Sequence, residues 1–404
     1  MKKILFVTSE AHPLIKTGGL ADVSGSLPKA LAGLDVDVRL IMPKYQAIKT
    51  TEKIYYKSTV QVDNADANIL ETRLPGTQVI VWLVDCPEFF NLPGNPYVDE
   101  NGNAWPNSAE RFALFCRIAV EVAMNRGYLN WIPDIIHCND WQSGLVPALL
   151  SLESDRPATV FTIHNMAYQG IFPKATHASL NLPEQLWNPK GIEFNGMLSF
   201  LKGGLAYSDR ITTVSPTYAR EIQTADFGYG LEGLLSYRKE CLTGIINGID
   251  AEHWNPETDP NINEHFGLAT LNKKQRNKTA LQNKYFLPLD NNIPVIALVS
   301  RLVEQKGIDL VLDCLPEMLA LPLQFILLGT GNKNFEQQLN NFAKAYPDKM
   351  AITIGYDEGL AHLFEAGADI FLMPSRFEPC GLNQIYSQRY GTVPIVRKTG
   401  GLAD

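Results

Sequence analysis

Two basic residues follow an apolar run in the second half of the chain. Arg301 and Lys306 lie just past PVIALVS, and Lys306 is followed by Gly307 and a helical pattern. A bidentate guanidinium and a compact ammonium suit adjacent phosphates, so this pair points to a diphosphate. The alternative is that both residues are solvated surface cations.

A carboxylate occupies a similar position after another apolar run. Glu378 follows DIFLMP, and Gly381 opens the next helical pattern. A carboxylate near a phosphate site is electrostatically unfavourable unless it serves a hydroxyl-rich or cationic group. We therefore interpret Glu378 as a sugar ligand or a charge stabiliser, with a helix-start carboxylate as the alternative.

The heptapeptide KTGGLAD occurs twice, at residues 16–22 and 398–404. In the first copy, Gly18 and Gly19 allow a tight backbone approach just before a helix that should begin near Leu20. Amides at a helix N-terminus, together with the Lys16 ammonium, would form an anion site. The alternative is a purely geometric glycine turn.

Two further apolar runs of the first half end in polar residues, in DIIHCNDWQSG and ATVFTIHNMAYQG. They should bring Asp140, Trp141, His164 and Asn165 to one edge of a sheet. A carboxylate, an indole and an imidazole resemble a carbohydrate site, although each could be a satisfied core residue.

No metal site is expected from the cluster at His137, Cys138 and Asp140. His137 and Cys138 are neighbours on an expected strand, where successive side chains point to opposite faces.

The elements that position these residues alternate between strand and helix patterns in both halves, which is typical of parallel sheets in α/β folds. A helix is expected over 107–126, with Asn107 and Glu110 as a capping box, and another begins at Ser215-Pro216. The stretch NGIDAEHWNPETD has no periodicity and marks a boundary between domains 1–246 and 247–404. We expect two doubly wound domains facing a cleft, with ligands beyond the carboxyl ends of the strands.

Composition restricts the function. The net charge of −8 argues against a nucleic-acid binder, and no apolar run approaches the length of a membrane helix. The start MKKILFVTSE is interpreted as a buried strand rather than a signal peptide. Six cysteines without CxxC spacing fit reduced thiols, so a cytoplasmic location is expected.

Taken together, the motifs resemble one family, the bacterial glycogen synthases and plant starch synthases. These are retaining glucosyltransferases of glycosyltransferase family 5 with the two-domain GT-B fold. The resemblance covers essentially the whole chain and rests on SEAHPLIKTGGLADV, PYVDENG, HCNDWQSGL, FTIHNMAYQG, EFNGMLSFLKGGL, TTVSPTYARE, GLEGLL, INGID, VSRLVEQKG, IGYDE, MPSRFEPCGL and RKTGGLAD.

The resemblance implies that the first domain is the acceptor and catalytic domain and that the second binds the sugar nucleotide. It implies a catalytic set of Glu378, His164, Lys306 and Arg301. The implied donor ligands are Lys16, Gly18, Gly19, Tyr356, Cys380, Gly381, Leu382, Thr399 and Gly400. The implied acceptor or sugar ligands are Asp140, Asn165 and Glu10, and no metal or other cofactor is implied.

The implied reaction transfers glucose from ADP-glucose to the non-reducing end of an α-1,4-glucan in glycogen biosynthesis. Cations and glycine-turn amides would offset the charge of leaving ADP. The acceptor 4-hydroxyl would attack from the face that the diphosphate leaves, so the anomeric configuration is retained. The implied partners are ADP-glucose and a glucan primer, without nucleic acid or membrane.

Alternatives remain open at this point. UDP-glucose could replace ADP-glucose, because nothing in the glycine turns reads the base. The family continues beyond the second TGGLAD, so the second domain is expected to be incomplete, and a non-catalytic glucan- or nucleotide-binding fragment is another alternative. A dehydrogenase is disfavoured because TGGLAD lacks GxGxxG spacing.

Overall fold

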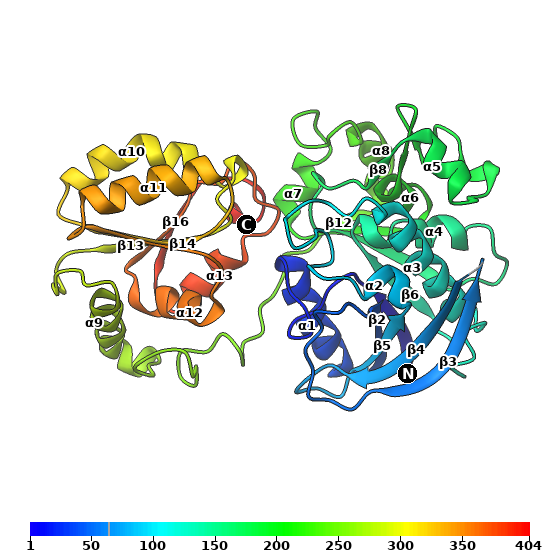
Figure 1. Cartoon of the computed structure of the whole chain (residues 1–404), viewed down its shortest axis with the longest axis horizontal. Helices are drawn as coiled ribbons and strands as arrows, with labels where there is room; N and C mark the ends of the chain where they lie inside the picture. The colour runs from blue at the N-terminus through cyan, green and yellow to red at the C-terminus, as the bar shows by residue number, and fades with distance from the viewer. Residues whose placement is uncertain (64) are drawn as a thin grey trace. The chain divides into compact units, whose positions relative to one another are not determined.

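The computed structural model describes residues 1–63 and 65–404. The chain divides into two compact units, Met1–Gly248 and Ile249–Asp404 (Figure 1). The division falls within the aperiodic stretch that begins at Asn247. Each unit is an α/β structure built on a largely or wholly parallel sheet, as the sequence predicts.

The first unit is built on a nine-stranded sheet with the order β12-β11-β7-β6-β1-β2-β5-β4-β3. The pairs from β12 to β5 are parallel, whereas β4 is antiparallel to both β5 and β3. The strands are β1 (Lys2–Val7), β2 (Val36–Pro43), β3 (Tyr55–Val62), β4 (Ala65–Arg73), β5 (Ile80–Asp85), β6 (Ile135–Asn139), β7 (Ala158–Ile163), β11 (Arg210–Thr213) and β12 (Leu242–Gly244).

A small three-stranded sheet, β8-β10-β9, accompanies the main sheet. Its strands are β8 (Ile171–Phe172), β9 (Glu193–Phe194) and β10 (Met197–Ser199). The helices of this unit are α1 (Gly19–Ala32), α2 (Pro87–Phe90), α3 (Ser108–Ala123), α4 (Leu145–Leu150), α5 (Lys174–Ser179), α6 (Phe200–Tyr207), α7 (Pro216–Glu221) and α8 (Glu232–Tyr237), with 3-10 turns η1 (Trp141–Ser143), η2 (Glu184–Leu186) and η3 (Lys239–Cys241).

Two helix predictions can be compared with these elements. The helix expected over 107–126 is confirmed as the buried helix α3, but the expected capping box is wrong. Asn107 has φ −97° and ψ 25° instead of an extended N-cap backbone, and its side chain makes no capping hydrogen bond. At α7, Ser215 accepts a hydrogen bond from the Tyr218 amide at 2.9 Å, with Pro216 in the first turn, as predicted.

The second unit has a wholly parallel five-stranded sheet with the order β15-β14-β13-β16-β17. Its strands are β13 (Val295–Val299), β14 (Gln324–Gly329), β15 (Met350–Ile354), β16 (Ile370–Met373) and β17 (Val393–Val396). The helices are α9 (Lys274–Lys284), α10 (Ile308–Ala320), α11 (Lys333–Ala345), α12 (Glu358–Gly367) and α13 (Leu382–Arg389), with 3-10 turns η4 (Leu268–Lys273), η5 (Glu304–Lys306) and η6 (Gly400–Leu402).

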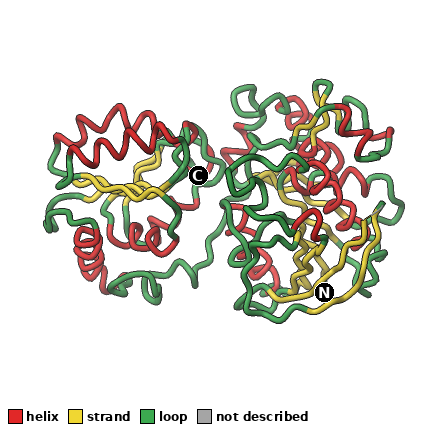
Figure 2. Tube along the Cα trace, viewed as in Figure 1, coloured by secondary structure: helices red, strands yellow, loops and turns green. Residues whose placement is uncertain are grey.

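Helices cover both faces of this second sheet, as Figure 2 shows. Helices α10 and α11 pack on one face, in a core that includes Leu315 and Leu339, while α9 and α12 pack on the other with Leu281 and Phe364 (Figure 1). Because both faces are covered, β14 is buried along its whole length. Functional side chains are therefore confined to the loops at the strand ends.

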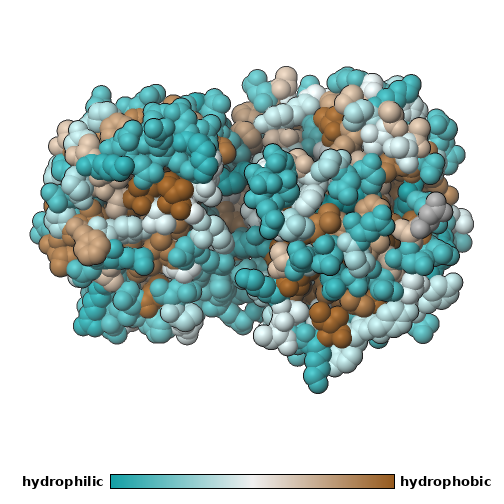
Figure 3. All heavy atoms as spheres, in the orientation of Figure 1, coloured by the Kyte–Doolittle hydropathy of each residue, from teal (hydrophilic) through white to brown (hydrophobic). Residues whose placement is uncertain are grey.

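The molecular surface drawn in Figure 3 is mostly hydrophilic, with apolar side chains gathered in small areas. Among the described residues, none of the helices combines the length and hydropathy needed to cross a bilayer.

Candidate functional site

In the second unit, the loops after the neighbouring strands β13 and β16 lie against each other. Gly307, which follows η5, has φ +70°, and a Cβ atom there would lie 2.3 Å from the Pro374 carbonyl oxygen. Only glycine fits this close approach without strain. The contact brings Lys306 to the loop that carries Glu378.

Lys306 and Glu378 form an ion pair between the Lys306 ammonium and Glu378 Oε2. Ser375 Oγ donates to the same carboxylate oxygen at 3.0 Å. Ser375 and Glu378 are 1% and 7% exposed. The cationic group that makes a carboxylate acceptable near an expected phosphate site is therefore Lys306 itself.

Arg301 is tied to the same loops through Gln305. Arg301 Nη2 donates to Gln305 Oε1 at 3.3 Å, and Gln305 Nε2 donates to the Phe377 carbonyl at 3.3 Å. The Gln305 carbonyl accepts a hydrogen bond from the Arg376 amide at 2.8 Å. Gln305 was missed in the sequence, where its only signal is its place between the two cations.

The second KTGGLAD copy packs on the Glu378 loop. The Gly401 amide donates to the carbonyls of Glu378 and Pro379 at 3.0 and 3.2 Å. A Cβ at Gly401 would lie 2.0 Å from the Cys380 carbonyl oxygen. Thr399, Gly400, Cys380, Gly381 and Leu382 are thereby gathered around the Glu378 loop, with Gly381 at φ +82° as the N-cap of α13.

Tyr356 stands apart from this group on the sheet. It follows β15, the edge strand, which β14 separates from β13. Its side chain is 69% exposed, and its hydroxyl donates to Glu358 Oε2 at 3.1 Å. The Tyr356 ring is therefore exposed while its hydroxyl is held by Glu358.

In the first unit, the ends of β6 and β7 bring Asp140 and His164 together. The His164 amide donates to Asp140 Oδ1 at 2.7 Å. His164 Nε2 lies 3.0 Å from Asn139 Oδ1, and Asn139 Nδ2 donates to the Val7 carbonyl at 3.0 Å. Asn139 thus orients the imidazole from the neighbouring strand, a role that the sequence did not suggest.

Burial shifts the pKa of both side chains. Desolvation raises the pKa of Asp140 to about 7, although the amides of His164 and Asn165 oppose this shift by hydrogen bonding. Burial lowers the pKa of His164 to about 3, with His137 adding to the effect. His164 is therefore neutral at physiological pH and acts as a neutral hydrogen-bonding group.

Glu10 holds the first KTGGLAD copy in place. Its Oε2 accepts hydrogen bonds from the amide and hydroxyl of Thr17, both at 2.6 Å, and its Oε1 accepts one from the Tyr97 hydroxyl at 3.1 Å. Glu10 is 2% exposed, and desolvation raises its pKa. Its observed partners are protein groups that position the loop.

Lys16 and the glycine turn lie at the start of α1. Lys16 Nζ is 2.7 Å from Asp22 Oδ1 in the first turn of that helix. Gly18 is the N-cap with an extended backbone, and a Cβ there would meet nothing within 4 Å. A side chain at this position would therefore meet no steric obstacle.

Trp141 is half-buried, and its ring packs against other aromatic side chains. Its ring contacts Phe112, Phe172 and Phe200 with centroid distances of 5.0, 5.9 and 6.1 Å. A Cβ at Gly170 would lie 2.3 Å from the ring. The indole therefore supports the Asp140 loop by packing beneath it.

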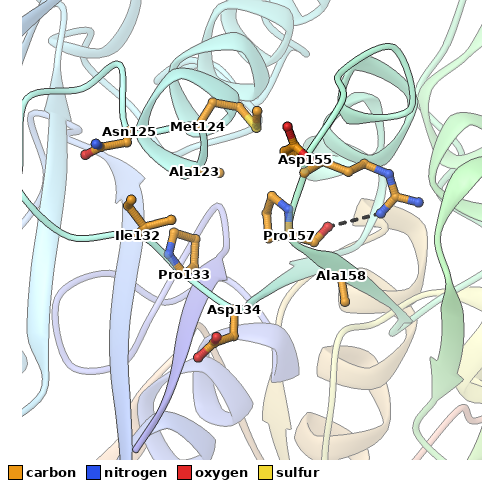
Figure 4. Close-up of a pocket in the computed structure, with 10 residues that line it drawn as sticks. Ala123, Met124, Asn125, Ile132, Pro133, Asp134, Asp155, Pro157 and Ala158 are labelled. Carbon is orange, nitrogen blue, oxygen red and sulfur yellow. Dashed lines mark hydrogen bonds between the residues drawn. The ribbon is translucent and has the colours of Figure 1, made fainter.

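A surface hollow of about 510 Å³ lies at the amino ends of β6 and β7, opposite the strand ends that carry Asp140 and His164 (Figure 4). Its lining includes Asp134 just before β6 and Ala158 at the start of β7. Arg156 at its rim is paired with Asp209 at 2.8 and 2.9 Å. The polar groups described above converge at the carboxyl ends of the strands, which is where ligands of doubly wound sheets bind, and not at this hollow.

The two sheets, one largely and one wholly parallel, carry cations, carboxylates and glycine turns at the carboxyl ends of their parallel strands, an arrangement that defines a two-unit α/β protein of the doubly wound type. The family model for the starch synthase catalytic domain matches residues 3–237, and that for glycosyl transferases group 1 matches residues 279–404.

Curated relatives match over the full length of this chain. They include glycogen synthase 1 of Methylococcus capsulatus, 58% identical over 100% of this chain and 82% of its own length. The glycogen synthase of Cellvibrio japonicus is 53% identical over 100% of this chain and 85% of its own.

Solved structures also resemble this chain. The catalytic domain of starch synthase IV from Arabidopsis thaliana, bound to ADP and acarbose, superposes with a TM-score of 0.90 at 33% identity, over 100% of this chain and 84% of that one. A sucrose-phosphate synthase from Thermosynechococcus elongatus shares the fold, with a TM-score of 0.57 at 16% identity. The chain belongs to the glycogen synthase and starch synthase family, whose members are glucosyltransferases of the GT-B fold.

Proposed function

We propose that this protein transfers glucose from ADP-glucose to the non-reducing end of an α-1,4-glucan with retention of the anomeric configuration. The observation that carries the proposal is the Lys306–Glu378 ion pair, which lies beside the Arg301 loop and the second glycine turn. The names of the relatives and the ADP bound to the starch synthase support the choice of substrates.

The second unit supplies the donor contacts. Arg301 and Lys306 neutralise the diphosphate, and the amides of Thr399 and Gly400 face its oxygens. Glu378 accepts hydrogen bonds from donor glucose hydroxyls, next to the backbone of Cys380, Gly381 and Leu382. When Lys306 turns to the diphosphate, the Glu378 carboxylate is released to stabilise the positive charge that develops on the sugar.

The first unit supplies the remaining groups. Lys16 and the amides of Gly18 and Gly19 add positive potential for the diphosphate. His164, held neutral by burial with its Nε2–H directed at Asn139 Oδ1, accepts a hydrogen bond through Nδ1 at the glucose, while Asp140 and Asn165 serve the acceptor end. Glu10 contributes by holding the KTGGL loop through Thr17.

The reaction then needs no metal ion. Leaving ADP accumulates negative charge, which these cations and amides offset, and its phosphate takes the proton of the attacking 4-hydroxyl. A chelator should leave the rate unchanged. A cytoplasmic setting, expected from the cysteine pattern, is part of this proposal.

The deciding experiment offers labelled ADP-glucose and labelled UDP-glucose separately, each with a glycogen primer. Faster incorporation of label from ADP-glucose is expected. Faster incorporation from UDP-glucose would overturn the donor assignment, and ADP binding without incorporation from either donor would leave a binding protein in place of an enzyme.

A further inference from the structure

The segment that opens the second unit is fastened to two helices by an aromatic stack. The Trp254 ring lies between His362 of α12 and Tyr386 of α13, with centroid distances of 3.7 and 3.8 Å and interplanar angles of 11° and 9°. Asp259, farther along the segment, accepts hydrogen bonds from His362 Nδ1 at 2.7 Å and from the Tyr390 hydroxyl at 2.6 Å. The backbone around residue 254 is therefore fixed against α12.

His253 lies next to this stack and points toward the start of α12. Its ring meets those of Trp254 and His362 edge-on, with centroid distances of 5.8 and 5.0 Å. Its backbone amide donates to Asp250 Oδ1 at 3.2 Å. These contacts place His253 Nε2 at 3.1 Å from Glu358 Oε1.

The Glu358 carboxylate bridges two side chains. Its Oε1 faces His253 Nε2, and its Oε2 accepts the hydrogen bond of the Tyr356 hydroxyl at 3.1 Å. The neighbouring residue Asp357 caps α12 through a hydrogen bond from the Leu360 amide at 2.8 Å, so the backbone at this bridge is also fixed. The position of the Tyr356 ring is thus connected to the Trp254 stack through Glu358 and His253.

We propose that His253 and Glu358 are positioning residues that hold the Tyr356 ring ready to pack on the base of the nucleotide donor. The inference rests on the proposed function, in which Tyr356 contacts that base. A ring held in its bound orientation loses less conformational entropy when the ligand arrives. The pair therefore strengthens nucleotide binding without touching the reacting atoms.

The test compares His253→Ala, Tyr356→Phe and their double variant in the full chain. Tyr356→Phe keeps the ring but removes the hydroxyl that Glu358 holds. Each single variant is expected to raise the KM for the donor and the Kd for ADP by about three- to tenfold, with the effect on KM and not on kcat. The double variant should lose no more than either single one, because both break the same connection.

His265→Ala is the matched control. His265 lies in the same segment and contacts the Asp259 carbonyl at 2.9 Å, so its loss perturbs the segment without reaching Glu358. Its donor KM should equal that of the parent protein. His253→Gln, which can still donate to Glu358, should restore most of the affinity.

Three results would overturn the inference. These are multiplying effects in the double variant, an unchanged Kd for ADP in His253→Ala, or the same rise in KM for His265→Ala. If His253→Ala does not fold, Tyr356→Phe at its exposed position decides alone, and an unchanged Kd there refutes the role of the bridge.

ADP binding is measured by calorimetry and does not depend on turnover. A parent protein that binds ADP but transfers no glucose would therefore refute the proposed enzyme reaction and leave this inference testable. A parent protein that does not bind ADP would refute both.

Discussion

The Lys306 ammonium and Glu378 Oε2 form an ion pair at the carboxyl ends of the neighbouring strands β13 and β16. Both side chains are largely buried, with exposed fractions of 19% and 10%. The pair places a cation directly beside a carboxylate. In the proposed reaction, a bound diphosphate draws the ammonium away and so changes the charge that the sugar experiences.

Replacing Lys306 by alanine should lower kcat by roughly 10²- to 10³-fold, the range observed when one preorganised electrostatic group is removed. The loss has two parts, since the diphosphate loses a cation and Glu378 is left uncompensated in a buried position. Single-turnover transfer of labelled glucose measures it. Lys333→Ala is the control because the Lys333 side chain, which pairs with Glu336 in the first turn of α11, is itself 84% exposed. An unchanged kcat in Lys306→Ala would remove Lys306 from the mechanism.

Asp140→Asn should change how stability depends on pH. The pKa of Asp140 is about 7 in the folded state against an ordinary value of 3.8, so the folded state binds the extra proton between these values. Its contribution to stability is present below pH 4 and is lost as pH rises through 7. The free energy of unfolding of Asp140→Asn, relative to that of the parent protein, should therefore rise by about 2–3 kcal/mol between pH 5 and pH 8.

The titration of His164 changes stability with pH in the opposite direction and gives a comparison within the same protein. Its folded pKa of about 3 lies below the ordinary 6.5, so its contribution to stability is lost as pH falls from 6.5 toward 3. Urea unfolding at pH 5, 6.5 and 8 measures how the free energy of unfolding changes with pH over both ranges. If the free energies of unfolding of Asp140→Asn and the parent differ by the same amount at all three pH values, Asp140 is ionised over the whole range.

Gly18→Ala should separate folding from ligand binding. A Cβ at Gly18 meets nothing within 4 Å, and its φ of −161° is extended backbone that any residue adopts. The melting temperature should therefore stay within about 2 °C of the parent value. The donor KM should rise because the added methyl group stands where the diphosphate approaches the helix amides. An unchanged KM would place the donor elsewhere.

Gly401→Ala should affect stability first. Its Cβ would lie 2.0 Å from the Cys380 carbonyl oxygen, so the second glycine turn has to move away from the Glu378 loop. Overpacking of this kind costs about 1–3 kcal/mol, measurable as a lower urea midpoint. Gly233→Ala, where a Cβ meets nothing within 4 Å, is the control. Equal stability of Gly401→Ala and the parent would contradict the tight packing of the two loops.

The succession of strands and helices, and the loops where polar residues gather, were predictable from the amino-acid sequence. Alternation of apolar runs with helical periodicity is a local signal, so β13, β16 and α3 could be read directly. The family was also visible, because glycine turns such as KTGGLAD and SRFEPCGL are contiguous in sequence.

Which of these side chains meet became evident only in the folded chain. The Lys306–Glu378 pair joins residues 72 positions apart and depends on the pairing of β13 with β16, and the Asp140–His164 contact depends on the pairing of β6 with β7. Trp141 was ambiguous because an indole suits both a sugar and a core, and the folded chain places it half-buried against Phe112, Phe172 and Phe200. The bridge from His253 through Glu358 to Tyr356 had no sequence signal, since burial and hydrogen bonding between distant segments are properties of the folded chain.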